Sequence, residues 1–307
     1  MDESIINFIL LHDDVIMMSK VKVEHYVPRF YLNKFTIDGK GKSVYCYDKV
    51  LSKSFVCAME DVAREKYFYD TMPGDGNVEK TLAELESKIV VAYRKLISVK
   101  DILKLNLNER EYLATFAIVQ EFRTMEWRAA LKDLSLQTKH RLSKYKLSDK
   151  LKTELEEVSK PDFHKELQLK FLMGTSEFIE MLFGMKWILI ENRTKMPFWT
   201  SDHPVSRYNP IDKSPLGNLG LLCEGIQMYL PLTPSLSLCF CDLVNYFTFP
   251  DRMIADKVEN VVFQNSLQVR SSMRSIYSCN DDFSLAKEIL EEHPDLRNIN
   301  RKRFSVS

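Results

Sequence analysis

Histidine, basic and aromatic side chains alternate in the segment HYVPRFYLNKF at residues 25–35. His25 and Arg29 in this segment could hold an anionic group, the imidazole as acid, base or ligand and the guanidinium as a bidentate clamp. The alternative interpretation is an aromatic anchor in which the histidine is satisfied internally and the stem of the arginine lies along apolar surface. The sequence leaves both interpretations open.

Carboxylates flank a second aromatic cluster, in EDVAREKYFYD at residues 60–70. Glu65 and Asp70 stand on either side of three aromatic rings. Carboxylates in such surroundings can bind a divalent cation or act as a base with a raised pKa. The competing interpretation is that they cap local structure or pair at the surface.

Four consecutive polar residues occur in FWTSDHPV at residues 198–205, where a strand is expected to end. Side chains at the ends of strands often belong to active sites. Neighbouring side chains on a strand point apart, so Asp202 and His203 do not form a Ser-His-Asp triad with Ser201. Either could instead be a metal ligand, or the segment could be a turn that caps the strand.

Charged residues also interrupt the helical stretch that begins near Val78. Glu79 and Glu86 are seven positions apart and therefore share one helix face. On the next helix, Gln120 and Arg123 take positions where an apolar stripe would continue. We predict that Arg123 points inward and that Glu79 or Glu86 lies within hydrogen-bond reach, because a buried unpaired charge is costly. The pair is either structural or one wall of a charged site.

The periodicities predict an α+β fold, with a mixed, mainly antiparallel sheet and a bundle of long helices packed on one side. One long helix is expected from a cap at Asn106 to about residue 136, and a last helix over 252–272. Residues 44–48 and 54–58 read as a hairpin. The predicted organisation has three parts: an extension at 1–20, a single domain at 21–280 with a helical middle at 78–184, and a polar C-terminal tail at 281–307.

Composition excludes several classes of protein. The chain has 307 residues, with 43 Lys and Arg against 43 Asp and Glu, so no global basic excess is available to neutralise a nucleic acid. A local basic cleft is still compatible with this balance. Six cysteines without a CxxC pair, and no secretory signal or long apolar run, predict a cytoplasmic protein with reduced thiols and no membrane span.

Taken in order, these segments resemble the bacterial domain-of-unknown-function family 4238 over about residues 23–280. His203 is a departure, since Asn is more frequent at that position of the family pattern. The resemblance implies a bacterial protein, some of whose relatives are similar to single-gene antiphage defence factors, and supplies no catalytic residue. The phrases that carry it are HYVPRFYLNKF (25–35), EKYFYD (65–70), VEKTLAELE (78–86), QEFRT (120–124), WILIEN (187–192), FWTSDHPV (198–205) and YLPLTP (229–234).

Two functions are compatible with these features. The first is an antiphage defence effector that hydrolyses a phosphodiester of nucleic acid with a divalent cation, Mg²⁺ or Mn²⁺. The second is a non-catalytic sensor or binding module that recognises a phage protein, as a phage-derived trigger, or a small ligand. Either function requires the polar residues to converge. The roles expected in the hydrolase are metal ligation by Glu65, Asp202 and Glu79, general base or ligand for His25, and phosphate binding by Arg29 and Arg123.

Overall fold

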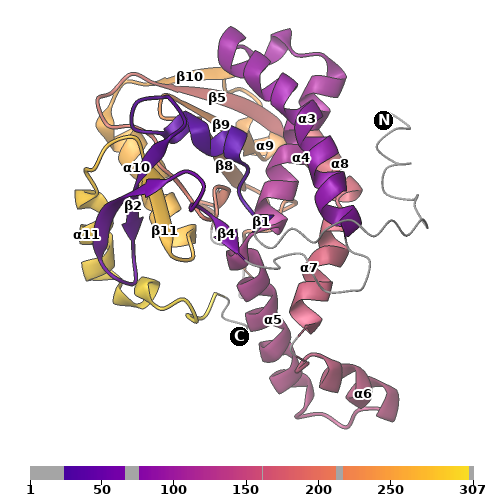
Figure 1. The fold of residues 1–307 in the computed structure, drawn as a ribbon. Coiled ribbons are helices and arrows are strands. Elements are labelled where there is room, and N and C mark those ends of the chain that lie inside the picture. Colours follow the sequence, from indigo (N-terminus) through magenta and orange to yellow (C-terminus); the bar gives the residue numbers. More distant parts are fainter. Residues whose placement is uncertain (1–23, 66–75, 161, 212–216, 304–307) are drawn as a thin grey trace.

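The computed structural model describes residues 24–65, 76–160, 162–211 and 217–303 (Figure 1). The predicted extension at 1–20 and the carboxylate of Asp70 lie outside these residues. Within the described part of the chain, no helix is long and apolar enough to cross a membrane. The helices of the middle third gather on one side of the strands, as Figure 1 shows.

Six helices make up the middle of the chain. They are α3 (Gly76–Val99), α4 (Leu107–Phe122), α5 (Met125–Leu142), α6 (Asp149–Glu157), α7 (Phe163–Met173) and α8 (Ser176–Phe183). A 3₁₀ turn at Ile102–Lys104 joins α3 to α4. The capping box predicted at the start of α4 is present, because Asn106 accepts from the backbone N–H of Glu109 and Glu109 accepts in return.

The prediction of one helix to about residue 136 is wrong, because the helix breaks after Phe122. Thr124 has an extended backbone, and its side chain accepts a hydrogen bond from the N–H of Trp127. A threonine that satisfies one of the first N–H groups of a helix starts a new helix rather than continuing the old one. The two-residue joint at Arg123–Thr124 separates α4 from α5.

A five-stranded sheet lies against the bundle, in the order β10-β5-β9-β8-β7. Its strands are β5 (Lys186–Asn192), β7 (Ser206–Tyr208), β8 (Gln227–Thr233), β9 (Leu236–Cys241) and β10 (Arg252–Ala255). Only β10 pairs in parallel, with β5. This mixed, mainly antiparallel sheet with helices massed on one side confirms the predicted α+β class. The expected helix at 252–272 is shorter, since β10 takes its first residues and α10 spans Val258–Ser271.

Alternation along the strands gives the five-stranded sheet two apolar faces. Trp187 and Phe240 belong to the main core together with residues of α3, α4 and α8. Ile188 and Cys239, one position along their strands, belong to a separate cluster on the opposite face, which α10 partly covers through Leu267. A short helix, α9 (Leu243–Tyr246), follows β9.

A second sheet contains the predicted hairpin and has the order β3-β2-β11-β6. All its pairings are antiparallel. The described strands thus form two main sheets, where we expected a single sheet. Its strands are β2 (Ser43–Asp48), β3 (Lys53–Ala58), β6 (Thr200–Ser201) and β11 (Ser275–Ser278). A two-stranded ribbon pairs β1 (Glu24–His25) with β4 (Arg64–Glu65), and α2 (Arg29–Leu32) and a 3₁₀ turn at Asn33–Phe35 follow β1.

Residues 281–307 are more than the polar tail that we expected. They include the helix α11 (Ser284–Glu292) and a 3₁₀ turn at Pro294–Arg297. Phe283, Ala286 and Leu290 are fully or almost fully buried against Trp199 and Tyr47. Their spacing of three and four residues is helical, but the charged residues between them hide it. The helix α11 therefore packs against the four-stranded sheet and the segment before it.

Candidate functional site

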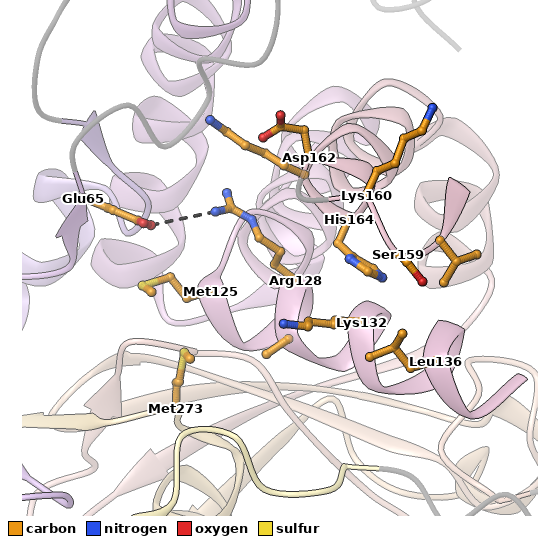
Figure 2. Close-up of a pocket in the computed structure, with 13 residues that line it drawn as sticks. Glu65, Met125, Arg128, Lys132, Leu136, Ser159, Lys160, Asp162, His164 and Met273 are labelled. Carbon is orange, nitrogen blue, oxygen red and sulfur yellow. Dashed lines mark ion pairs between the residues drawn. The ribbon is translucent and has the colours of Figure 1, made fainter. Parts of the chain in front are cut away.

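A cleft of about 740 Å³ opens between α5, the connection from α6 to α7, and the first turn of α7 (Figure 2). We call it the charged cleft. The turn after α10 contributes Met273, and β4 contributes Glu65. The remaining lining residues are Met125, Arg128, Ala129, Lys132, Leu136, Val158, Ser159, Lys160, Asp162, His164 and Lys165.

Basic side chains outnumber acidic ones in this cleft. Arg128 and Lys132 are four residues apart on α5 and therefore share a helix face. Lys160 and Lys165 line the cleft from the other wall, against only two carboxylates, Glu65 and Asp162. The chain as a whole has no net charge, so this cleft is a local excess of positive charge, which the composition did not exclude.

The guanidinium of Arg128 is held in place by Gln168 of α7. Nε of Arg128 donates to Oε1 of Gln168 at 2.7 Å, and only 1% of Gln168 is exposed. The amide nitrogen of Gln168 in turn donates to the carbonyl oxygens of Phe122 and Thr124, at 2.7 and 2.9 Å. A buried amide that bonds both the guanidinium and the α4–α5 joint fixes the direction in which Arg128 points.

Glu65 faces Arg128 across the cleft, as the dashed line in Figure 2 shows. Nη1 of Arg128 lies 3.9 Å from Oε2 of Glu65, an ion pair without a hydrogen bond. That carboxylate oxygen is buried and has no hydrogen-bond partner among the described residues.

His164 is the side chain of this cleft that is best suited to act as a base. It is 7% exposed, and its Nε2 is buried without a partner in the part of the chain that the structure describes. Burial lowers the pKa of His164, and the charge of Lys132 lowers it further. The imidazole is therefore neutral at neutral pH and has a ring nitrogen that can accept a proton or a hydrogen bond.

Several of the predicted residues form a hydrogen-bond network around Arg123, at the α4–α5 joint. Nη1 of Arg123 donates to Glu86 at 2.7 Å and its Nε donates to Gln120 at 3.0 Å. Arg123 is 2% exposed, which confirms the predicted inward orientation and the pairing with Glu86. Gln120 also donates to the carbonyl of Tyr26, so this network ties the N-terminal segment to α3 and α4. The side chain of Glu79 lies outside the described residues.

His25 lies near this network and not in the charged cleft. Its Nδ1 is 3.1 Å from the carbonyl oxygen of Val62, and it is half-buried. Burial lowers the pKa of His25; the charge of Arg29 acts in the same direction and that of Glu86 opposes it. Arg29 itself is exposed on α2. His25, Arg29 and Arg123 thus share a region of the protein, but none of them lines the charged cleft.

Asp202 is bonded entirely to the backbone of the turn that follows α10. Its carboxylate accepts from the N–H groups of Met273, Arg274 and Ser275 at 2.7–2.9 Å, and only 5% of the residue is exposed. Burial raises the pKa of Asp202, although Lys49 and the three N–H donors favour the charged form. Asp202 thereby holds Met273 in the wall of the cleft. Of the two roles considered for Asp202, these bonds fit the structural one and not metal ligation.

The other polar side chains at this strand end are also bonded internally. Their partners lie on α2, α10 and the α4–α5 joint. Oγ1 of Thr200 is 2.6 Å from Tyr31 Oη, Oγ of Ser201 donates to Gln268 at 2.8 Å, and Nδ1 of His203 is 2.6 Å from Thr124 Oγ1.

The described residues do not assemble the expected metal site. No group of three or more His, Cys, Asp or Glu side chains is placed there to hold an ion. Of the predicted ligands, Glu65 faces the guanidinium of Arg128, and Asp202 is occupied by three backbone donors. Glu65 and Asp202 therefore do not converge on one ion, and the role of Glu79 lies outside the described side chains.

Sequence reasoning found one residue of the charged cleft, Glu65, and missed Arg128, Lys132 and His164. The four-residue spacing of Arg128 and Lys132 was a detectable signal on a predicted helix. His164 gave none, because it reaches the cleft only when α7 packs against α5.

Comparison with known proteins gives one finding. A family model described as "Protein of unknown function (DUF4238)" matches residues 24–282, from β1 to the residue before Phe283. No curated protein and no solved structure matches the chain.

Proposed function

This chain belongs to the DUF4238 family, and we propose that within that fold the charged cleft binds a phosphate-bearing ligand of nucleotide type. The observation that carries the proposal is the set of four basic side chains around one cleft on a chain of zero net charge. Guanidinium and ammonium groups are the side chains that bind phosphate most strongly.

The orientation of Arg128 supports this proposal. Gln168 accepts from Nε of Arg128, so the direction of the guanidinium is set before a ligand arrives. Pre-set donors bind more tightly than mobile ones because the ordering cost has been met during folding. The carboxylate of Glu65, at 3.9 Å from Arg128, is the group that a phosphate oxygen would displace.

The apolar part of the cleft accounts for the rest of the ligand. Met125, Ala129, Leu136, Val158 and Met273 contribute to its lining. An apolar wall beside a cationic one suits a molecule with a phosphate at one end and a base or sugar at the other. A lone inorganic anion would not use this wall.

Hydrolysis of a phosphodiester is the second candidate function, and His164 favours it. Its neutral Nε2 would take a proton from water while the water oxygen attacks phosphorus and the ester oxygen leaves. Arg128 and Lys132 would stabilise the charge that develops on the phosphoryl oxygens. The requirement for Mg²⁺ or Mn²⁺ stays a prediction, tested by incubating the protein with short DNA and RNA with and without each ion.

The test of binding compares thymidine 5′-monophosphate with thymidine by titration calorimetry. We expect saturable binding of the monophosphate only, weakened by added salt. Arg128→Gln should reduce the affinity about 10- to 100-fold, the effect of losing a charged hydrogen bond. Arg94→Gln is the matched control, since Arg94 is an exposed arginine on α3 outside the cleft. Equal affinity for both ligands, or an unchanged Arg128→Gln variant, contradicts the proposal.

His164→Gln separates binding from hydrolysis. This variant should keep the affinity for thymidine 5′-monophosphate within about threefold, because a neutral ring is replaced by a neutral amide. Any cleavage of DNA or RNA should fall about 100-fold or more, the usual contribution of a general base. Absent cleavage in the unaltered protein overturns the hydrolase assignment and leaves the binding function standing. Cleavage that persists in His164→Gln overturns the role of His164 as the base.

In the cell, we propose an antiphage role, with nucleic acid as the substrate and a phage-derived molecule as the trigger. It rests on the resemblance to defence factors and on the basic cleft. Cells that express the protein should resist some members of a phage panel, and Arg128→Gln should abolish that resistance at equal expression. Resistance that survives this substitution would separate defence from the charged cleft.

A further inference from the structure

A second cavity, of about 280 Å³, lies on the face of the five-stranded sheet that points away from the helical bundle. We call it the sheet cavity. Strands β5, β8 and β9 form its floor, and α9, β10 and α10 form its walls. The lining residues are Ile188, Ile190, Gln227, Tyr229, Cys239, Cys241, Tyr246, Phe249, Met253, Ile254, Ala255, Asn260, Phe263 and Gln264.

No residue in that set carries an ionised side chain at neutral pH, in contrast to the charged cleft. The two thiols on β9 project from the same face, and their Sγ atoms are 3.2 Å apart. Burial raises the pKa of the Cys239 thiol, so this thiol is protonated at neutral pH. The cavity therefore suits a neutral guest.

Aromatic rings define the shape of the cavity. The rings of Tyr229 and Phe263 meet edge to face with centroids 5.8 Å apart, and those of Tyr246 and Phe249 do so at 5.3 Å. Phe249 and Met253 are 40% and 37% exposed and form an apolar rim at the surface. Aromatic walls favour a flat guest, because a flat guest can stack on or meet ring edges. A volume of this size holds a compound of one or two rings.

One amide in the cavity lacks a partner. The amide of Gln227 is satisfied, since its oxygen accepts from Tyr229 Oη and its nitrogen donates to Tyr246 Oη. Gln264 on α10 is only 4% exposed, and its Oε1 is buried with no hydrogen-bond partner among the described residues. Buried acceptors are nearly always bonded in folded proteins, so an orphaned one in a cavity indicates a missing donor.

We propose that the sheet cavity binds a neutral, flat aromatic or heteroaromatic small molecule whose single N–H or O–H group donates to Oε1 of Gln264. The aromatic and aliphatic walls supply affinity, and the amide oxygen selects compounds with a donor. This site is independent of the charged cleft, which differs from it in every lining residue.

The experiment uses indole as a probe with one N–H and 1-methylindole as the same ring system without it. Titration calorimetry with the full chain should show saturable binding of indole, and weaker binding of 1-methylindole. Gln264→Leu replaces the amide with an apolar side chain of comparable volume and removes the acceptor. This variant should lose about 3- to 10-fold in affinity for indole and little for 1-methylindole, as expected for one neutral hydrogen bond.

Two controls keep the result interpretable. The thermal unfolding midpoint of Gln264→Leu should equal or exceed that of the unaltered chain, since an unsatisfied buried acceptor is removed. Arg128→Gln should bind indole as the unaltered chain does, so a failed nucleotide site leaves this test intact. No saturable binding of indole, or an equal loss for both probes in Gln264→Leu, overturns the proposal.

Discussion

The charged cleft and the sheet cavity occupy different kinds of framework, and their chemistry follows from that difference. The cleft lies between helices, where residues four apart such as Arg128 and Lys132 point the same way and bring two positive charges to one opening. The cavity lies on a sheet, where alternation brings Cys239 and Cys241 onto an apolar face. Helix packing thus exposes charge, and strand alternation hides a neutral surface, in a chain whose net charge is zero.

The largest effect is expected from a substitution that weakens the wall of the charged cleft and leaves its cationic side chains unchanged. Asp202→Asn replaces a carboxylate that accepts three backbone hydrogen bonds with an amide that cannot accept all of them. We expect a loss of about 3 kcal/mol in the free energy of unfolding, measured in urea, because bonds to charged groups are the stronger ones. Asp38→Asn, at an exposed acceptor, should change it by less than about 0.5 kcal/mol. An unaltered stability with lost function would instead make Asp202 catalytic.

A smaller effect is expected at the α4–α5 joint, which belongs to neither site. Arg123→Lys keeps the charge but cannot bond Glu86 and Gln120 together, because an ammonium lacks the planar fork. The free energy of unfolding should fall by about 1–2 kcal/mol. Binding of thymidine 5′-monophosphate and of indole should both persist in titrations of the folded variant. Loss of nucleotide binding alone would place Arg123 in the charged site after all.

The smallest effect is a difference in pH dependence between the two sites. Burial and Lys132 lower the pKa of His164, so the unfolded chain takes up a proton at that residue at a higher pH than the folded chain does. Its contribution to stability is therefore complete above about pH 6.5 and is lost as the pH falls below that value. His164→Gln should flatten the slope of unfolding free energy against pH in this window. The affinity for indole should stay constant between about pH 5.5 and 8, since the sheet cavity has no ionised residue.

Local patterns in the sequence predict those parts of the fold that are built from local contacts. The capping box at Asn106 and the hairpin of β2 and β3 depend on residues close in the chain. The pairing of Arg123 with Glu86 was predictable too, because a charge on an apolar stripe requires a partner on the facing helix. These cases share one property, since each needs only helix or strand periodicity and one adjacent element.

The sites depend on packing that no local pattern specifies. Val158 and Lys160 lie in a stretch rich in lysine, serine and glutamate, where no sequence pattern marks them as a wall of the cleft. The start of α5 also depends on Thr124, whose hydroxyl accepts from the N–H of Trp127. The sheet cavity exists because α10 covers only part of one sheet face, which is a property of the assembled layers.

The position of β11 bears on how the chain is made. Residues 275–278 pair with β2 on one side and β6 on the other, so the centre of the four-stranded sheet joins segments that lie far apart in the sequence. Pairings between distant residues form slowly, and synthesis delivers the N-terminal hairpin first. Until β11 leaves the ribosome, one edge of β2 remains without its partner and can pair with other strands. The nascent chain therefore exposes that edge of β2 until residues 275–278 have been made.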